Sequence, residues 1–186
     1  MPSPNQKQFL TNLKKSLDTT HADMVKLAQQ RADFQRRVDD GIWQPEYASA
    51  EIEAVEREMQ KRHDEGEEQV NDLIAKRIEE LAAADALDPS MLTPDAELLK
   101  LDVLDAHDLA QMQKRNAGNP TMGRLIVKYA QRHGIEVDVP SYVYELAEDR
   151  NATKNMYEVT RVALKWVGDE KQGQNVLDRL FAQVGV

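Results

Sequence analysis

Residues 4–40 decide the fold, and they read PNQKQFLTNLKKSLDTTHADMVKLAQQRADFQRRVDD. Apolar residues recur in this stretch in alternating steps of three and four. The positions that follow the spacing are Leu10, Leu13, Leu17, Thr20, Met24, Leu27, Arg31, Phe34 and Val38. A seven-residue repeat of this kind keeps one stripe of a helix facing a partner over its whole length. The stretch therefore predicts one long helix of a coiled coil.

A second helix of similar length is expected after a short turn. Gly41 can end the first helix in a left-handed conformation, and Pro45 suits the first turn of the next helix. No proline interrupts the chain from there to Ala86, and good helix formers dominate. Two such helices fold back on each other, so we predict an antiparallel hairpin over residues 1–87. Arms from two different chains could also pair through the same apolar stripe.

Charge is spread unevenly over the two arms. The whole chain of 186 residues has a formal net charge of −9. Residues 1–44 hold seven Lys or Arg against five Asp or Glu, whereas residues 45–86 hold five against thirteen. We expect the two oppositely biased arms to lie against one another. The chain lacks the long basic cluster that a general nucleic-acid coat needs, so nucleic acid is not an expected partner.

The hairpin also predicts which residues face each other. Folding the chain about the turn sets Gly66 near Thr20, a polar position of the seam. The same fold sets Arg31 near Glu56. We hypothesise that Arg31 reaches a carboxylate there, that of Glu56 or of Glu53, and helps to fix the register of the arms.

Prolines mark a boundary after the hairpin. Residues 88–104 contain two of them, at Pro89 and Pro94, and read as a linker. Residues 105–186 then predict a small module of short helices, with a capped start at Asp105, another start at Asn119-Pro120 and a stop at Gly134. Residues 135–139 alternate apolar and acidic and are interpreted as an extended linker rather than a short strand. The predicted fold class is all-α, a long hairpin followed by a compact bundle.

Composition narrows the class of protein. Charged residues make up 31% of the chain and aromatic residues 5%, which suits long helices that bury a narrow seam. There is no cysteine, so disulfides and thiolate metal sites are excluded. The first ten residues lack the layout of a signal peptide, and no apolar run reaches the roughly 20 residues of a membrane helix. We expect a cytoplasmic protein without a membrane segment.

Catalytic signatures are missing from the sequence. The four histidines are His21, His63, His107 and His133, and none has a His at the close spacing that metal binding favours. The chain holds no nucleophile elbow, no phosphate-binding loop and no dinucleotide fingerprint. We therefore expect a protein that is not an enzyme and uses no cofactor and no metal.

The turn of the hairpin is one candidate interaction site. Ile42, Trp43 and Tyr47 cluster where two helices turn and little else can cover them. These side chains either pack on each other and clamp the turn, or expose Trp43 as the anchor for a protein partner.

The last predicted helix is a second candidate. It carries Leu177, Leu180, Phe181 and Val184 on one face. That face either docks on the module of residues 105–186 or lies in the groove of a partner.

Residues 121–150 permit a rival interpretation. The helix from Met122 to His133 carries the cations Arg124, Lys128 and Arg132, as the first helix of a DNA-binding helix-turn-helix can. The segment from Tyr142 to Asp149 that would present groups to bases is apolar or acidic, which phosphates would repel.

One run of sequence resembles a known group of proteins. The run is Asn119-Pro120-Thr121-Met122-Gly123-Arg124-Leu125-Ile126-Val127-Lys128-Tyr129-Ala130, and it follows an acidic hairpin and a proline-broken linker. This order resembles small acidic helical proteins encoded among the head-assembly genes of tailed bacteriophages and prophages. The resemblance implies a scaffolding-like or capsid-associated role, self-association, and capsid or portal proteins as partners.

Taken together, these features predict a non-enzymatic assembly protein of phage or prophage origin. Its hairpin would serve as a spacer or dimerisation rod, in the host cytoplasm or the virion. The alternatives are a cytoplasmic coiled-coil adaptor or regulator, and the DNA-binding module described above.

Overall fold

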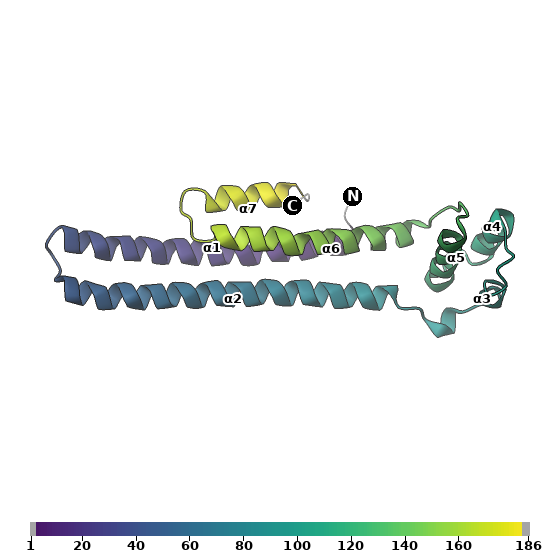
Figure 1. Ribbon diagram of the computed structural model, residues 1–186, viewed down its shortest axis with the longest axis horizontal. Coiled ribbons are helices and arrows are strands. Elements are labelled where there is room, and N and C mark those ends of the chain that lie inside the picture. The colour runs from purple at the N-terminus through teal and green to yellow at the C-terminus, as the bar shows by residue number, and fades with distance from the viewer. Residues whose placement is uncertain (1–2, 184–186) are drawn as a thin grey trace. The chain divides into compact units, whose positions relative to one another are not determined.

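The computed structural model describes residues 3–183, and in this range the chain is all-helical, with no strand. The predicted all-α class is confirmed. The elements are α1 (Pro4–Asp39), α2 (Pro45–Asp85), the 3-10 turn η1 (Pro89–Met91), α3 (Asp95–Leu98), α4 (Ala106–Arg115), α5 (Pro120–His133), α6 (Ser141–Trp166) and α7 (Gly173–Ala182) (Figure 1).

The ends of the helices lie where capping residues predict them. Gly41, at φ +72°, follows α1 in the left-handed conformation, and Pro45 begins α2. Asp105 and Asp108 form a reciprocal capping box at the start of α4. The side chain of Asn119 accepts from the main-chain N–H of Met122 at the start of α5. Local sequence therefore sets these helix boundaries.

The chain folds as two compact units. Unit 1 comprises residues up to Ile78 together with residues from Ala152 onward, and unit 2 comprises Glu79–Asn151. The boundaries fall inside α2 and α6. This grouping differs from the predicted division into 1–87, 88–104 and 105–186, because the C-terminal residues join the hairpin rather than residues 105–151.

Unit 1 is built around one apolar core to which four helices contribute. Its most buried members from α1 are Leu10, Leu13 and Leu17, each at most 1% exposed. The core also contains Val70 and Ile74 of α2, Met156, Ala163 and Leu164 of α6, Val167 just after α6, and Leu177 and Phe181 of α7. The hydrophobic stripe of α1 is thus covered from three sides, which a two-helix hairpin alone could not provide.

α2 returns along α1, as contacts between residues far apart in the sequence show. Ser16 donates to the side chain of Gln69 at 3.3 Å, and Arg31 donates to Glu56 at 2.8 Å. Gly66 lies against Thr20 so closely that a Cβ at Gly66 would fall 2.5 Å from Thr20 Cγ2. The predicted neighbours Thr20 and Gly66 are therefore confirmed, whereas knobs-into-holes packing along the seam stays a prediction.

α6 is one continuous helix of 26 residues, longer than the short helices predicted for residues 105–186. No proline or glycine occurs between Ser141 and Trp166, so no residue breaks the helix. In its second half the buried side chains include Thr153, Met156, Thr160 and Ala163, which recur in steps of three and four. This stripe supplies the α6 side of the unit 1 core.

Unit 2 has a smaller core between α4 and α5. Leu109 and Met112 of α4 pack with Ile126, Tyr129 and Ala130 of α5, and all five are at most 5% exposed. The partly buried residues around them are Leu99, Leu104, Ile135 and Val137. The segments before α4 and after α5 therefore wrap the same pair of helices.

Candidate functional site

The hairpin turn carries the predicted aromatic cluster. The Trp43 ring lies 5.1 Å from the ring of Phe34 and 5.0 Å from that of Tyr47, edge-on to the latter. The guanidinium of Arg37 sits over the Trp43 ring at 4.7 Å from its centroid. The sequence pattern does not single out Phe34 or Arg37 for this site, although both lie within nine residues of Trp43. Trp43 therefore packs against three side chains of its own chain.

The neighbours of Trp43 remain open to solvent. Ile42 is 68% exposed and Tyr47 is 56% exposed. The structure thus divides the predicted cluster into a packed ring, Trp43, and two presented side chains. An exposed isoleucine and an exposed tyrosine on one turn are the kind of surface that protein partners bind.

The part of unit 1 next to the turn has a thin core. Within residues 25–69 of the described chain, the only fully buried apolar side chains are those of Ala48 and Val55. The unit 1 core has no buried member between Met24 and Val70. Beyond Met24 the two arms are therefore paired mainly with each other, not with α6 and α7.

Arg31 and Glu56 meet in this thin part of the hairpin. Arg31 Nε donates to Glu56 Oε1 at 2.8 Å, and their side chains are 52% and 50% exposed. Glu53, the other predicted acceptor, lies 3.9 Å from Arg57 on its own helix. The contact selects Glu56 from the two carboxylates, and its role in setting the register stays a prediction because an exposed pair contributes little energy.

The predicted face of the last helix is not a presented surface. Leu177 and Phe181 are 0% exposed, inside the core of unit 1, and Leu180 is partly buried against the same core. α7 packs on α1 rather than on residues 105–151, and Lys14 of α1 pairs with Asp178 of α7 at 3.0 Å. These residues stabilise unit 1 and are unavailable to a partner while α7 is docked. Val184 lies outside the described residues.

The rival DNA-binding segment does not have the geometry of a helix-turn-helix. Seven residues, 134–140, separate α5 from α6, where that motif has a turn of three or four. Arg124 is 6% exposed, and its guanidinium donates to the carbonyl oxygens of Pro120, Ala84 and Ala86. This cation is therefore engaged with main-chain oxygens rather than presented to phosphates.

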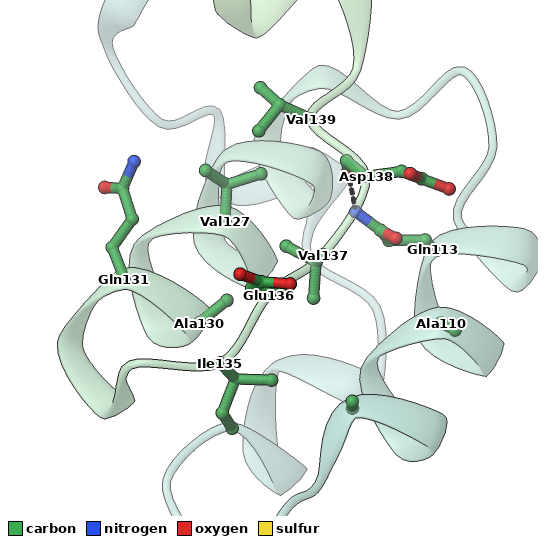
Figure 2. A pocket seen from close by; sticks show the side chains of 11 residues that line it. Ala110, Gln113, Val127, Ala130, Gln131, Ile135, Glu136, Val137, Asp138 and Val139 are labelled. Atoms are coloured by element: carbon green, nitrogen blue, oxygen red, sulfur yellow. Dashed lines mark hydrogen bonds between the residues drawn. The ribbon is translucent and has the colours of Figure 1, made fainter.

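A cavity of about 550 Å³ lies in unit 2 beside the segment that follows α5. Figure 2 shows aliphatic side chains on its walls, contributed by α4, α5 and residues 135–139. Gln113 donates to the carbonyl oxygen of Asp138 at 2.6 Å and fixes this segment on α4. Glu136 and Asp138 are the two carboxylates of the lining and both are exposed. Sequence reasoning found the apolar and acidic alternation here but not the cavity.

Two of the four histidines, His21 and His133, contact other parts of the chain. His21 is 6% exposed, and its Nδ1 accepts from the main-chain N–H of Gly168 at 3.2 Å. His133 stacks on Tyr129 with 4.3 Å between ring centroids, and its Nε2 lies 3.2 Å from Asp102. In residues 3–183, no group of three or more His, Asp and Glu side chains is placed to hold a metal ion.

No helix in the described range combines the length and the apolar character needed to cross a bilayer. Comparison of the chain with protein-family models, with curated proteins and with solved structures found no match.

Proposed function

We propose that this chain is a non-enzymatic assembly protein that acts through protein–protein contacts, with the hairpin turn as the binding end. The observation that carries the proposal is that the turn combines a packed Trp43 ring with an exposed Ile42 beside it. Trp43 is locked by Phe34, Arg37 and Tyr47, while Ile42 stays 68% exposed. A partner that covers this turn gains apolar burial without first having to order it.

The hairpin supports this role by carrying the turn away from the core of unit 1. The last buried core residue of α1 is Met24, and α1 continues for 15 residues to Asp39. At about 1.5 Å per residue, that is a reach of about 22 Å. Coiled-coil packing along this part, which the heptad spacing predicts, would make the arm a rigid spacer.

Phage or prophage head assembly is the biological setting that we propose, in the host cytoplasm or the virion. Its support is the resemblance of residues 119–130 and of the acidic hairpin to proteins of head-assembly gene clusters. The partners would be capsid or portal proteins together with further copies of the chain.

Site-specific cross-linking tests the binding role of the turn. The chain has no cysteine, so Ile42→Cys gives a single attachment point for a maleimide photo-cross-linker. Ile78→Cys is the matched control, because Ile78 is also an exposed isoleucine, 54% exposed, on α2. In an extract of cells that produce the phage particle, we expect a cross-linked product that forms from position 42 only and contains a structural protein of the particle.

A competitor makes the result quantitative. Unlabelled wild-type protein should suppress the position 42 product, and protein carrying Ile42→Lys should not. Ile42 is 68% exposed and is not one of the residues that hold Trp43, so the fold should survive. Identical products at positions 42 and 78, or equal suppression by both competitors, would show that the turn is not the binding end.

A further inference from the structure

Residues 87–103 of unit 2, which we call the strap, expose an unusual number of large apolar side chains. Each of the following is at least 40% exposed: Leu87, Met91, Leu92, Leu98, Leu101 and Val103. The sequence analysis interprets this stretch as a linker, yet it carries a short 3-10 turn and α3. Exposed apolar side chains gathered in one ordered segment mark an interaction surface.

Polar contacts hold the strap on α4 and α5. Asp95 receives hydrogen bonds from Arg115 Nη2 at 2.8 Å and from Asn116 Nδ2 at 2.7 Å. Thr93 donates to Asn116 Oδ1 at 2.9 Å, and Asn119 Nδ2 donates to the carbonyl oxygen of Met91 at 2.7 Å. These polar contacts, together with Leu99 packed against the unit 2 core, hold the segment on α4 and α5 and leave six of its large apolar side chains exposed. Such a segment is ordered before it binds, which lowers the entropy cost of binding.

The charge of the strap indicates the chemistry of what covers it. Between residues 87 and 103 the acids are Asp88, Asp95, Glu97 and Asp102, and Lys100 is the one base. Asp95 pairs with Arg115. Glu97 and Asp102 are each 73% exposed, with Glu97 paired to Lys100 at 2.7 Å and Asp102 lying 3.2 Å from His133, so the strap as a whole keeps an excess of acids. A complementary surface is apolar and edged with Lys or Arg.

The chain itself carries a surface of this kind, on the second half of α6 in unit 1. Val162 and Trp166 are 44% and 36% exposed on the side of α6 that faces away from the unit 1 core. The same side presents Lys154, Arg161 and Lys165, against one acid, Glu158, which lies 3.5 Å from Arg161. Lys154, Glu158, Val162 and Trp166 follow one another in steps of four and therefore form one row along the helix, with Arg161 and Lys165 beside it. We call this surface the α6 outer face.

We propose that the strap of one copy of the chain docks on the α6 outer face of a second copy. Leucine and valine side chains of the strap would cover Val162 and Trp166. Exposed Glu97 and Asp102 would meet the basic edge formed by Lys154, Arg161 and Lys165. In the proposed contact the copies associate head to tail, so an open assembly keeps a free strap at one end and a free α6 outer face at the other. This contact involves neither Ile42 nor Tyr47, so it is independent of the turn.

Two single substitutions test the contact from its two sides. Leu101→Lys places a cation in the strap, opposite a basic surface, and Val162→Glu places an anion on the α6 outer face, opposite an acidic one. Both residues are exposed, at 55% and 44%, so neither change should affect folding. Sedimentation velocity should show that each variant self-associates at least about 10-fold more weakly than wild type, since like charges in a contact are costly.

The equimolar mixture of the two variants is the decisive sample. The Val162→Glu protein keeps a native strap and the Leu101→Lys protein keeps a native α6 outer face, so the mixture should form 1:1 complexes with nearly wild-type affinity. Ile78→Glu, at another exposed isoleucine of unit 1, is the control and should associate as wild type does. Added salt should weaken the wild-type association.

Three results would overturn the contact. They are a wild-type chain that stays monomeric at its highest soluble concentration, variants that associate like wild type, and a mixture no more associated than its components. Loss of association with Ile42→Lys but not with Leu101→Lys would reject this contact and leave the proposed role of the turn standing.

Discussion

Leucine side chains have opposite surroundings in the apolar core of unit 1 and in the strap of unit 2. Leu10, Leu13 and Leu17 of α1 are at most 1% exposed, whereas Leu98 and Leu101 of the strap are 40% and 55% exposed. In unit 1 apolar burial orders the helices, and the buried polar residues of α1 are Gln6, Thr20 and His21. In the strap the carboxylate of Asp95 and the inward-packed Leu99 hold the segment, and most of its large apolar side chains are exposed. Which side chains stabilise a segment therefore depends on what the segment packs against.

The largest effect should separate the two leucine environments directly. Leu13→Ala removes a side chain that is 0% exposed and should lower the free energy of unfolding by about 2–5 kcal/mol. Leu101→Ala should change it by about 0.5 kcal/mol or less, because the side chain is already in water. Urea unfolding of the two variants gives both values, and equal losses would remove the distinction.

The close approach of the helices at Gly66 gives the next effect. In an ordinary helix Gly→Ala stabilises by about 1 kcal/mol. Here the new Cβ would fall 2.5 Å from Thr20 Cγ2, so Gly66→Ala should cost about 1–3 kcal/mol instead. Thr20→Ala removes the opposing atoms, and in that background Gly66→Ala should become neutral or stabilising. Thermal unfolding of the wild type, the two single variants and the double variant gives the coupling energy between Thr20 and Gly66. That energy would be zero if the two residues did not touch.

The next substitution removes a polar contact of the strap, whereas Leu13→Ala removes an apolar one. Asp95→Asn keeps the size of the side chain but weakens its contacts with Arg115 and Asn116, and should cost about 1–2 kcal/mol. Hydrogen exchange should then show faster opening of residues 87–103 and little change in α1. Uniform acceleration in both units would mean that the anchor is not local.

The same carboxylate gives the strap a dependence on pH. The hydrogen bond from Arg115, followed by that from Asn116, holds the pKa of Asp95 below its ordinary value of 3.8 against an opposing effect of burial. A lowered pKa in the folded state stabilises at pH values above 3.8, and this stabilisation is lost as the pH falls through the folded value. Strap protection should therefore decline below about pH 4 in the wild type. Asp95→Asn should lack this decline.

The smallest effect concerns Arg31 and Glu56 in the thin part of the hairpin. Both side chains are about half exposed, so Arg31→Leu should cost only about 0.2–1 kcal/mol and less at high salt. Arg57→Leu is the control, because Arg57 pairs at 3.9 Å with Glu53 on its own helix. A more stable Arg31→Leu protein with an unchanged oligomeric state would refute a role for the pair in setting the register.

Much of the hairpin could be predicted because it depends on neighbours in sequence. Helix ends at Gly41, Pro45 and Asp105 follow from backbone preferences that act within a few residues. A short turn between two helices then fixes which residues meet, and this arithmetic brought Thr20 to Gly66 and Arg31 to Glu56. The candidate site at the turn was found for the same reason, since Ile42, Trp43 and Tyr47 lie within six residues.

The location of the C-terminal helix could not be predicted in this way. Leu177 and Phe181 identify an apolar face but not the surface that covers it, and several apolar faces in the chain are of similar size. The structure pairs that face with α1, about 160 residues earlier in the chain, so Leu177 and Phe181 proved to be core residues and not a partner site. The surface of the strap was not predicted for a related reason. Its composition does not show which of its residues are exposed and which contact α4 and α5.

The helical character of the chain, most helix boundaries and the proximity of Thr20 to Gly66 and of Arg31 to Glu56 follow from the sequence, because they depend on local preferences and short connections. Only tertiary packing explains why α6 and α7 complete the core of unit 1 and why most of the large apolar side chains of the strap are exposed. Those outcomes depend on which distant faces fit one another, and periodicity does not contain that information.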